Sequence, residues 1–236
     1  MSKSSFLPIY EKFCEERHNA LVKFGWFEGF GVPYYIANEI ADHLDAMTQE
    51  KADAIIMDYF KNNNYAELIK MVARWELSPR LNTRKHIFDE AVASHIQERY
   101  YSSATLLAVH IEGIVADYIR CEKTARFKLE GMINDLKQHL NRNLDRVNFP
   151  KIDQRLLFEF LEDVYNTRFW HEDPSLIKDP DKNNGAFEAS HNLSRNKIAH
   201  GHVIIGLTEA DSLKCFLYIH ELFHLFVELD RGGDLR

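Results

Sequence analysis

Apolar residues recur at helical spacing along most of the chain, and this pattern predicts a series of amphipathic helices rather than strands. A run of asparagines, Asn62-Asn63-Asn64, interrupts the pattern, and Ser78-Pro79 ends its first section. The spacing therefore predicts four helices before that point, over residues of about 10–24, 33–47, 48–60 and 65–75.

The same spacing appears twice within residues 81–120, which predicts a helical hairpin with its joint at Tyr100-Tyr101-Ser102. Thr208-Glu209-Ala210-Asp211 matches a capping box and predicts the start of a final, largely apolar helix. Between the hairpin and this helix, the pattern predicts a polar loop over residues 173–185 and helices over residues 123–144, 152–170 and 187–201.

These elements predict an all-α fold. The chain has 236 residues with only 10 glycines and 6 prolines, and that scarcity favours helices over a turn-rich β fold. The length suits one large domain or two small ones. We expect a helical N-terminal region over residues 1–80, followed by a helical bundle over residues 81–236.

The charge of the chain limits the partners that we expect. A net charge of −7 argues against broad, nonspecific binding to nucleic acid. Residues 120–155 nevertheless hold nine basic side chains against five acidic ones. This local excess suits either a solvated helix face or a local contact with nucleic acid.

Other features predict a cytoplasmic protein that does not enter the membrane. Cys14, Cys121 and Cys215 lie far apart and form no CxxC pair, as is typical of reduced thiols. The N-terminus lacks the apolar segment of a secretory signal. No run approaches the roughly 18 apolar residues of a membrane span.

The most informative motif is Arg195-Asn196-Lys197-Ile198-Ala199-His200-Gly201. On a helix, Asn196 and His200 lie one turn apart on the same side, with Arg195 beside them. A guanidinium can bind and neutralise a phosphate, and an imidazole exchanges protons near neutral pH. RNA cleavage without a metal requires both abilities, so the motif suits an RNA-cleaving site. The spacing taken alone favours the alternative, a surface arginine and a histidine that caps the end of a helix.

A known family shares this motif and its surroundings. Residues 84–120, RKHIFDEAVASHIQERYYSSATLLAVHIEGIVADYIR, are followed far downstream by SRNKIAHG and a final apolar helix. Together these segments resemble the HEPN domain, a helical bundle of bacterial defence systems, toxin–antitoxin pairs and RNA-processing proteins, whose hallmark is R-x(4–6)-H. Residues 1–80 would form a helical extension of this HEPN-like bundle.

The resemblance implies a metal-independent endoribonuclease, a homodimer with RNA as substrate and no cofactor, possibly acting with an antitoxin or defence-system partner in phage defence or stress response. It implies catalytic roles for Arg195, Asn196, His200 and Glu112. The contacts expected with RNA come from Arg120, Lys123, Arg126 and Lys197. His202 stands where a toxin subgroup carries a modified tyrosine, so that regulation is not expected here. The alternative is a non-catalytic module that binds a nucleotide or a protein partner.

A second motif competes with the first. His220-Glu221-Leu222-Phe223-His224 matches HExxH, in which two histidines bind zinc and the glutamate acts as a base. The surrounding apolar residues are also those of a core helix, and few residues remain to supply a third ligand. The sequence therefore favours a structural helix over a zinc hydrolase, and no metal site is predicted.

Overall fold

The computed structural model describes residues 3–27, 29, 31–118, 136–138 and 207–231. Within these ranges every regular element is a helix and there is no strand, so the predicted all-α fold is confirmed. None of the helices in the described ranges is long and apolar enough to cross a membrane.

Two helices and a glycine-rich loop form the N-terminal part. Helix α1 (Lys3–Lys23) packs against α2 (Tyr34–Asp42), whose first residue follows Pro33. Between them Gly25 adopts a φ of 74°, which glycine tolerates without a steric cost. The turn lets Trp26 enter the core and donate a hydrogen bond from Nε1 to the Asp53 carboxylate at 2.7 Å.

Helix α3 (Gln49–Arg74) begins where the sequence predicts, because the Thr48 side chain accepts a hydrogen bond from the Lys51 backbone. The predicted interruption is confirmed as well. Asn62 is extended, and the next residues, Asn63, Asn64 and Tyr65, adopt left-handed φ values of 52°, 57° and 59°. The two helical stretches on either side of this break therefore run in different directions.

A short connection leads from α3 into the predicted hairpin. It consists of a 3-10 turn, η1 (Trp75–Leu77), and one helical turn, α4 (Pro79–Asn82). The hairpin itself is α5 (Lys85–Ile96) packed on α6 (Tyr100–Tyr118). The expected joint at Tyr100-Tyr101-Ser102 was wrong by three residues: the chain turns over residues 97–99, where Glu98 has a φ of 59°, and Tyr100 already begins α6.

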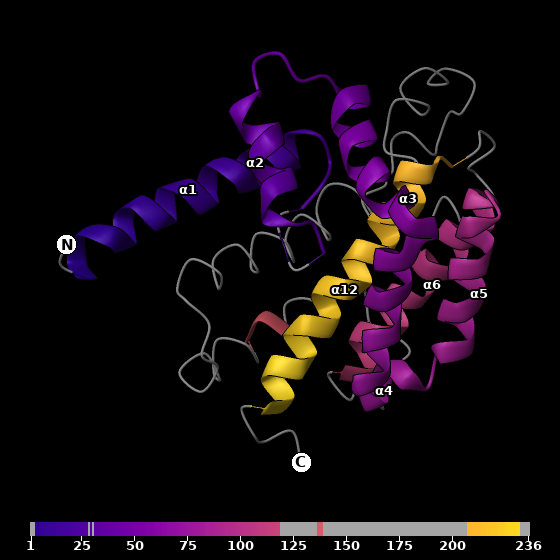
Figure 1. Ribbon diagram of the computed structural model, residues 1–236. Helices are drawn as coiled ribbons and strands as arrows, with labels where there is room; N and C mark the ends of the chain where they lie inside the picture. The colour runs from indigo at the N-terminus through magenta and orange to yellow at the C-terminus, as the bar shows by residue number, and fades with distance from the viewer. Residues whose placement is uncertain (1–2, 28, 30, 119–135, 139–206, 232–236) are drawn as a thin grey trace, which may run out of the picture.

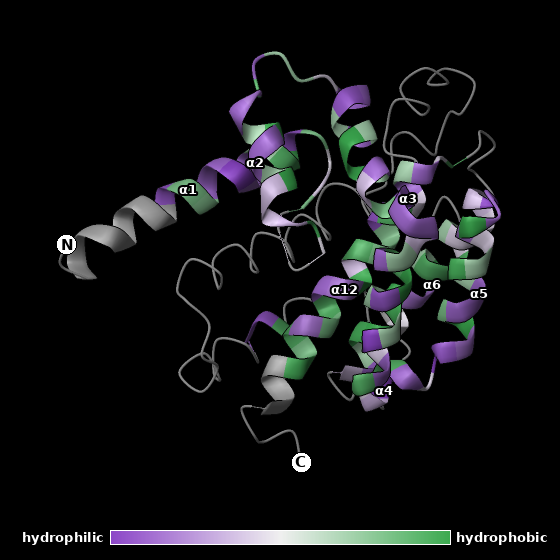
Figure 2. Ribbon diagram, viewed as in Figure 1, coloured by the Kyte–Doolittle hydropathy of each residue, from purple (hydrophilic) through white to green (hydrophobic). Residues whose placement is uncertain are grey.

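The last helix, α12 (Glu209–Arg231), crosses the middle of the molecule and packs against α6, α3 and η1 (Figure 1). The predicted capping box is confirmed: Thr208 Oγ1 accepts from the Asp211 backbone at 3.2 Å, and the Asp211 carboxylate accepts from the Thr208 backbone at 2.9 Å. All residues from Cys215 to Phe223 are buried, so the helix is enclosed on all sides. Hydrophobic residues accordingly occur on most turns of α6 and α12 (Figure 2).

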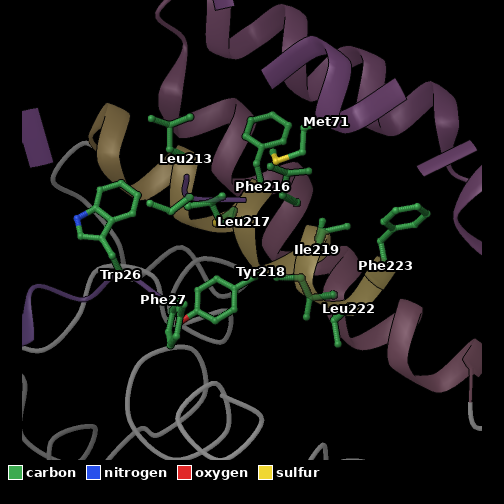
Figure 3. Packing of buried hydrophobic residues seen from close by; sticks show 14 of the residues in the cluster. Trp26, Phe27, Met71, Leu213, Phe216, Leu217, Tyr218, Ile219, Leu222 and Phe223 are labelled. Atoms are coloured by element: carbon green, nitrogen blue, oxygen red, sulfur yellow. The ribbon is translucent and has the colours of Figure 1, made fainter. Parts of the chain in front are cut away.

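The core around α12 joins segments that are far apart in the chain (Figure 3). Phe27 lies against Tyr218 with ring centroids 4.7 Å apart, so the N-terminal loop packs directly on the last helix. The loop reaches this close because its glycines lack side chains. A Cβ at Gly31 would lie 2.3 Å from a methyl group of Leu217, and a Cβ at Gly29 would lie 2.0 Å from the Glu221 carboxylate.

Some expectations concern other parts of the chain. The helices expected over residues 123–144, 152–170 and 187–201 lie outside the described residues, apart from a short helical piece over residues 136–138. The boundary near residue 80 stays a prediction.

Candidate functional site

Most of the site residues that the sequence predicts lie outside the described residues. These are Arg195, Asn196 and His200 of the motif and the expected RNA contacts Arg120, Lys123, Arg126 and Lys197. Glu112 lies within α6, but its side chain is outside the described part. Whether it approaches the motif stays a prediction.

The HExxH motif lies inside the core, on α12. His220 is 2% exposed, and its Nδ1 atom accepts a hydrogen bond of 3.1 Å from Nε1 of Trp75. An indole nitrogen can only donate, so Nδ1 of His220 carries no proton, and the neutral ring holds its proton on Nε2. This hydrogen bond therefore fixes the tautomer of the ring.

That tautomer does not suit a zinc ligand. Histidines that bind a metal through Nε2 donate their Nδ1 proton to a carbonyl or carboxylate, and they leave the Nε2 lone pair free for the ion. His220 has the opposite arrangement. The described residues contain no group of three metal-ligating side chains. The geometry at Trp75 assigns His220 a structural role and does not support the zinc-hydrolase alternative.

A different polar cluster surrounds the first turn of α12, where α3, α5 and α6 meet it. We call it the polar junction. The Glu209 carboxylate accepts a hydrogen bond from the Tyr65 hydroxyl at 3.1 Å and lies 2.7 Å from the Lys61 ammonium. The Glu209 side chain is only 10% exposed, so this ion pair is screened less by water than a surface pair. The members of the junction are Lys61, Tyr65, His95, Tyr100, Ser103, Glu209 and Ser212.

His95 occupies the centre of the polar junction and is fully buried. Its ring lies edge-on to Tyr65 and Phe216, with centroids 5.1 and 5.7 Å away, and Tyr100 lies 5.2 Å away. Nδ1 lies 2.8 Å from the Ser212 hydroxyl, which itself donates to Ser103 at 2.9 Å. The other ring nitrogen, Nε2, is buried and has no hydrogen-bond partner among the described residues.

Burial controls the protonation of the junction. It lowers the pKa of His95 to about 4, with a smaller opposing effect of Glu209, so the ring is neutral at pH 7. Burial and then the nearby Glu209 charge raise the pKa of Tyr65, and the same causes raise that of Tyr100. The hydrogen bond with Glu209 raises the pKa of Lys61. The cluster thus combines one ion pair with neutral phenols and a neutral imidazole.

The backbone beside the polar junction is strained. Tyr65 is the last of the three left-handed residues that follow Asn62, and a left-handed conformation costs roughly 1–2 kcal/mol for a residue with a side chain. Strain of this kind persists where surrounding contacts hold it, and it is frequent at functional positions. Here the contacts of Tyr65 with Glu209 and His95 hold the segment in place.

Sequence reasoning recognised only parts of the junction. The hairpin expected over residues 81–120 contains His95, but the sequence predicts neither its isolated Nε2 atom nor the contacts of Glu209 with Tyr65 and Lys61. The available signal was the asparagine run, since asparagine tolerates left-handed φ better than most residues. Chemically, the junction combines an ion pair with a buried, neutral imidazole.

No protein-family model, no curated protein and no solved structure matches this chain.

Proposed function

We propose that the protein is a metal-independent endoribonuclease of the HEPN type. The observation that carries the proposal is the pairing of the Arg195–His200 motif with an all-helical scaffold in which the α5–α6 hairpin packs against α12. The hairpin and the last helix are two of the segments on which the resemblance depends, and they lie side by side although about ninety residues separate them in sequence (Figure 1).

The proposed chemistry needs no cofactor. His200 acts either as the general base that removes the proton of a ribose 2′-hydroxyl or as the general acid that protonates the leaving 5′-oxygen. Arg195 binds the scissile phosphate and stabilises the negative charge that develops on it. Asn196 orients the phosphate or His200, and Glu112 holds Arg195 or His200 by a charge-assisted hydrogen bond. Two motifs from a homodimer form one composite cleft in this proposal.

Cleavage of labelled RNA in the presence of EDTA tests the proposal. We expect Arg195→Ala and His200→Ala each to slow cleavage by about 100-fold or more, because each removes a group needed in the transition state. Matched controls are Arg74→Ala and His43→Ala, which alter an exposed arginine on α3 and an exposed histidine at the end of α2. Circular dichroism checks that all four variants stay helical.

Two outcomes would overturn this function. The first is a wild-type protein that cleaves no member of a broad RNA panel, with EDTA or with magnesium. The second is cleavage that persists unchanged in His200→Ala. Binding of RNA or a nucleotide without cleavage would favour the alternative, a non-catalytic binding module.

A further inference from the structure

A line of exposed apolar residues runs along the outer side of the second half of α3. Ile69 is 45% exposed, and Leu77, in η1, is 75% exposed. They lie four residues before and four residues after Ala73, which is also exposed. Positions four apart follow one another along one side of a helix. The 3-10 turn continues this line because Arg74 and Trp75 keep helical backbone angles. We call Ile69, Ala73 and Leu77 the α3 stripe.

The opposite side of the same segment is already packed in the core. Leu68, Met71, Val72 and Trp75 are buried, and α3 contacts α5 and α12. A surface helix of this kind ordinarily carries polar residues on the side that faces water. The α3 stripe is therefore a second apolar side. Exposed apolar residues that adjoin one another and are rimmed by charges are typical of contact surfaces.

Charged residues flank the α3 stripe and complement one another about its centre. Lys70 lies three residues before Ala73, and Glu76 lies three residues after it. Lys70 is 69% exposed and Glu76 is 46% exposed, so both can reach a partner. Within the chain, Lys70 pairs with Glu67 at 2.7 Å. Glu76 pairs with Lys85 at 2.6 Å, and exposed ion pairs of this kind contribute little to stability. Opposite charges thus stand at equal distances from Ala73.

We propose that the α3 stripe is the contact surface of a homodimer, in which two α3 helices pack antiparallel about a two-fold axis at Ala73. In this arrangement Ile69 lies against Leu77 of the partner subunit, and Lys70 faces Glu76 of the partner subunit. The small side chain of Ala73 lets the two helices approach closely. A two-fold interface must complement itself, and both the apolar and the charged positions of this surface do so. This property selects a second copy of the chain over an unrelated protein, and it does not depend on the proposed nuclease.

Sedimentation equilibrium over a range of protein concentrations tests the dimer. We expect the wild-type protein to approach twice the mass of one chain. Ile69→Lys should weaken the association by at least about tenfold, because it puts an unpaired charge into the contact. The matched control is Ile96→Lys, which alters an exposed isoleucine at the end of α5 and should leave the association unchanged. A monomeric wild-type protein, or equal association of the two variants, would overturn the proposal.

An exchange of charges tests the antiparallel pairing. Lys70→Glu and Glu76→Lys should each weaken the dimer by about fivefold, because each puts like charges opposite one another across the axis. The double variant Lys70→Glu/Glu76→Lys restores opposite charges between the subunits and should recover the wild-type affinity. Within one chain, the double variant leaves like charges beside Glu67 and beside Lys85, so an effect confined to the single chain predicts no recovery. A double variant that associates no better than the single variants would contradict the proposed axis.

A single added cysteine locates the axis. Ala73→Cys should form a disulfide between two subunits under mild oxidation, since residues at a two-fold axis meet their own copies. The matched control is Ala54→Cys, at an exposed alanine in the first half of α3, and the wild-type protein gives the background from the native cysteines. Equal cross-linking of the two variants would place the contact elsewhere and overturn the proposal. A dimer that meets these tests in a protein without RNA cleavage would support the interface and overturn only the nuclease.

Discussion

Helix α12 carries or contacts two buried histidines, His220 at its own middle and His95 of α5 at its first turn, and their ring nitrogens have different surroundings. At the HExxH motif, Nδ1 of His220 accepts a hydrogen bond from Trp75, and the ring proton is on Nε2. At the polar junction, Nδ1 of His95 lies 2.8 Å from the Ser212 hydroxyl, and Nε2 is buried with no hydrogen-bond partner among the described residues.

The difference shows that a motif supplies side chains but not their protonation. The indole of Trp75 can only donate a hydrogen bond, so it decides which nitrogen of His220 carries the ring proton. Trp75 is 145 residues away from His220 in sequence. Nothing in the five letters of HExxH carries this information. The surrounding packing therefore distinguishes His220, whose Nδ1 atom accepts a hydrogen bond, from His95, whose Nε2 atom is buried without a partner among the described residues.

The largest expected effect on stability comes from substitutions of Trp75, the hydrogen-bond donor to His220. Trp75→Ala should lower the free energy of unfolding by about 3–5 kcal/mol, because it removes a buried aromatic side chain and leaves a cavity. Trp75→Phe keeps a ring but leaves Nδ1 of His220 without a donor, and we expect a loss of about 2 kcal/mol. Chemical denaturation followed by circular dichroism measures both. In a His220→Leu background the cost of Trp75→Phe should shrink, and an unchanged cost would contradict the importance of the hydrogen bond.

The next effect is a pH dependence that comes from His95. Its pKa is about 4 in the folded protein, below the ordinary 6.5, so the unfolded chain binds the proton more tightly. The contribution of His95 to the free energy of unfolding is therefore fully present above about pH 6.5. It is lost as the pH falls toward 4, by up to about 3 kcal/mol. Denaturant titrations at several pH values measure this slope. His95→Gln should flatten it, and an identical slope in that variant would show that other groups cause the acid sensitivity.

The smallest expected effect on stability comes from substitutions of Asn64, in the strained segment beside the polar junction. Asn64 is exposed and has a φ of 57°, so its substitutions report mainly on backbone strain. Asn64→Ala should destabilise the protein by about 1 kcal/mol, whereas Asn64→Gly should be close to neutral or stabilising. Thermal unfolding of the two variants gives the comparison. Equal stabilities would mean that the left-handed conformation is not maintained in solution.

Local signals in the sequence were enough to predict much of the fold. The Thr48 cap, the asparagine break and the Thr208–Asp211 capping box each act within a few residues, and the structure confirms all three. The hairpin joint was misplaced because Tyr100-Tyr101-Ser102 looks like a break, although the turn is made by Gln97 to Arg99. Aromatic residues tolerate a helix start when packing holds them there, and Tyr100 lies against His95.

The candidate sites were harder to predict, because their geometry depends on distant contacts. The polar junction joins Tyr65 to Glu209 across 144 residues, and an ion pair joins Arg84 to Asp117 across 33. Neither pairing leaves a periodic trace in the sequence. The Arg195–His200 motif is the reverse case: its spacing is visible in the sequence, and its surroundings lie outside the described residues.

The central position of α12 has a consequence for the order in which the molecule assembles. Trp75 is synthesised 145 residues before His220, and Tyr65 is synthesised 144 residues before Glu209. During translation, the apolar faces of the N-terminal loop, α3 and α6 that pack on α12 therefore stay uncovered by this helix until it is synthesised. Closure of the core comes late and joins distant segments, which makes folding slow and leaves the nascent chain prone to association with other proteins.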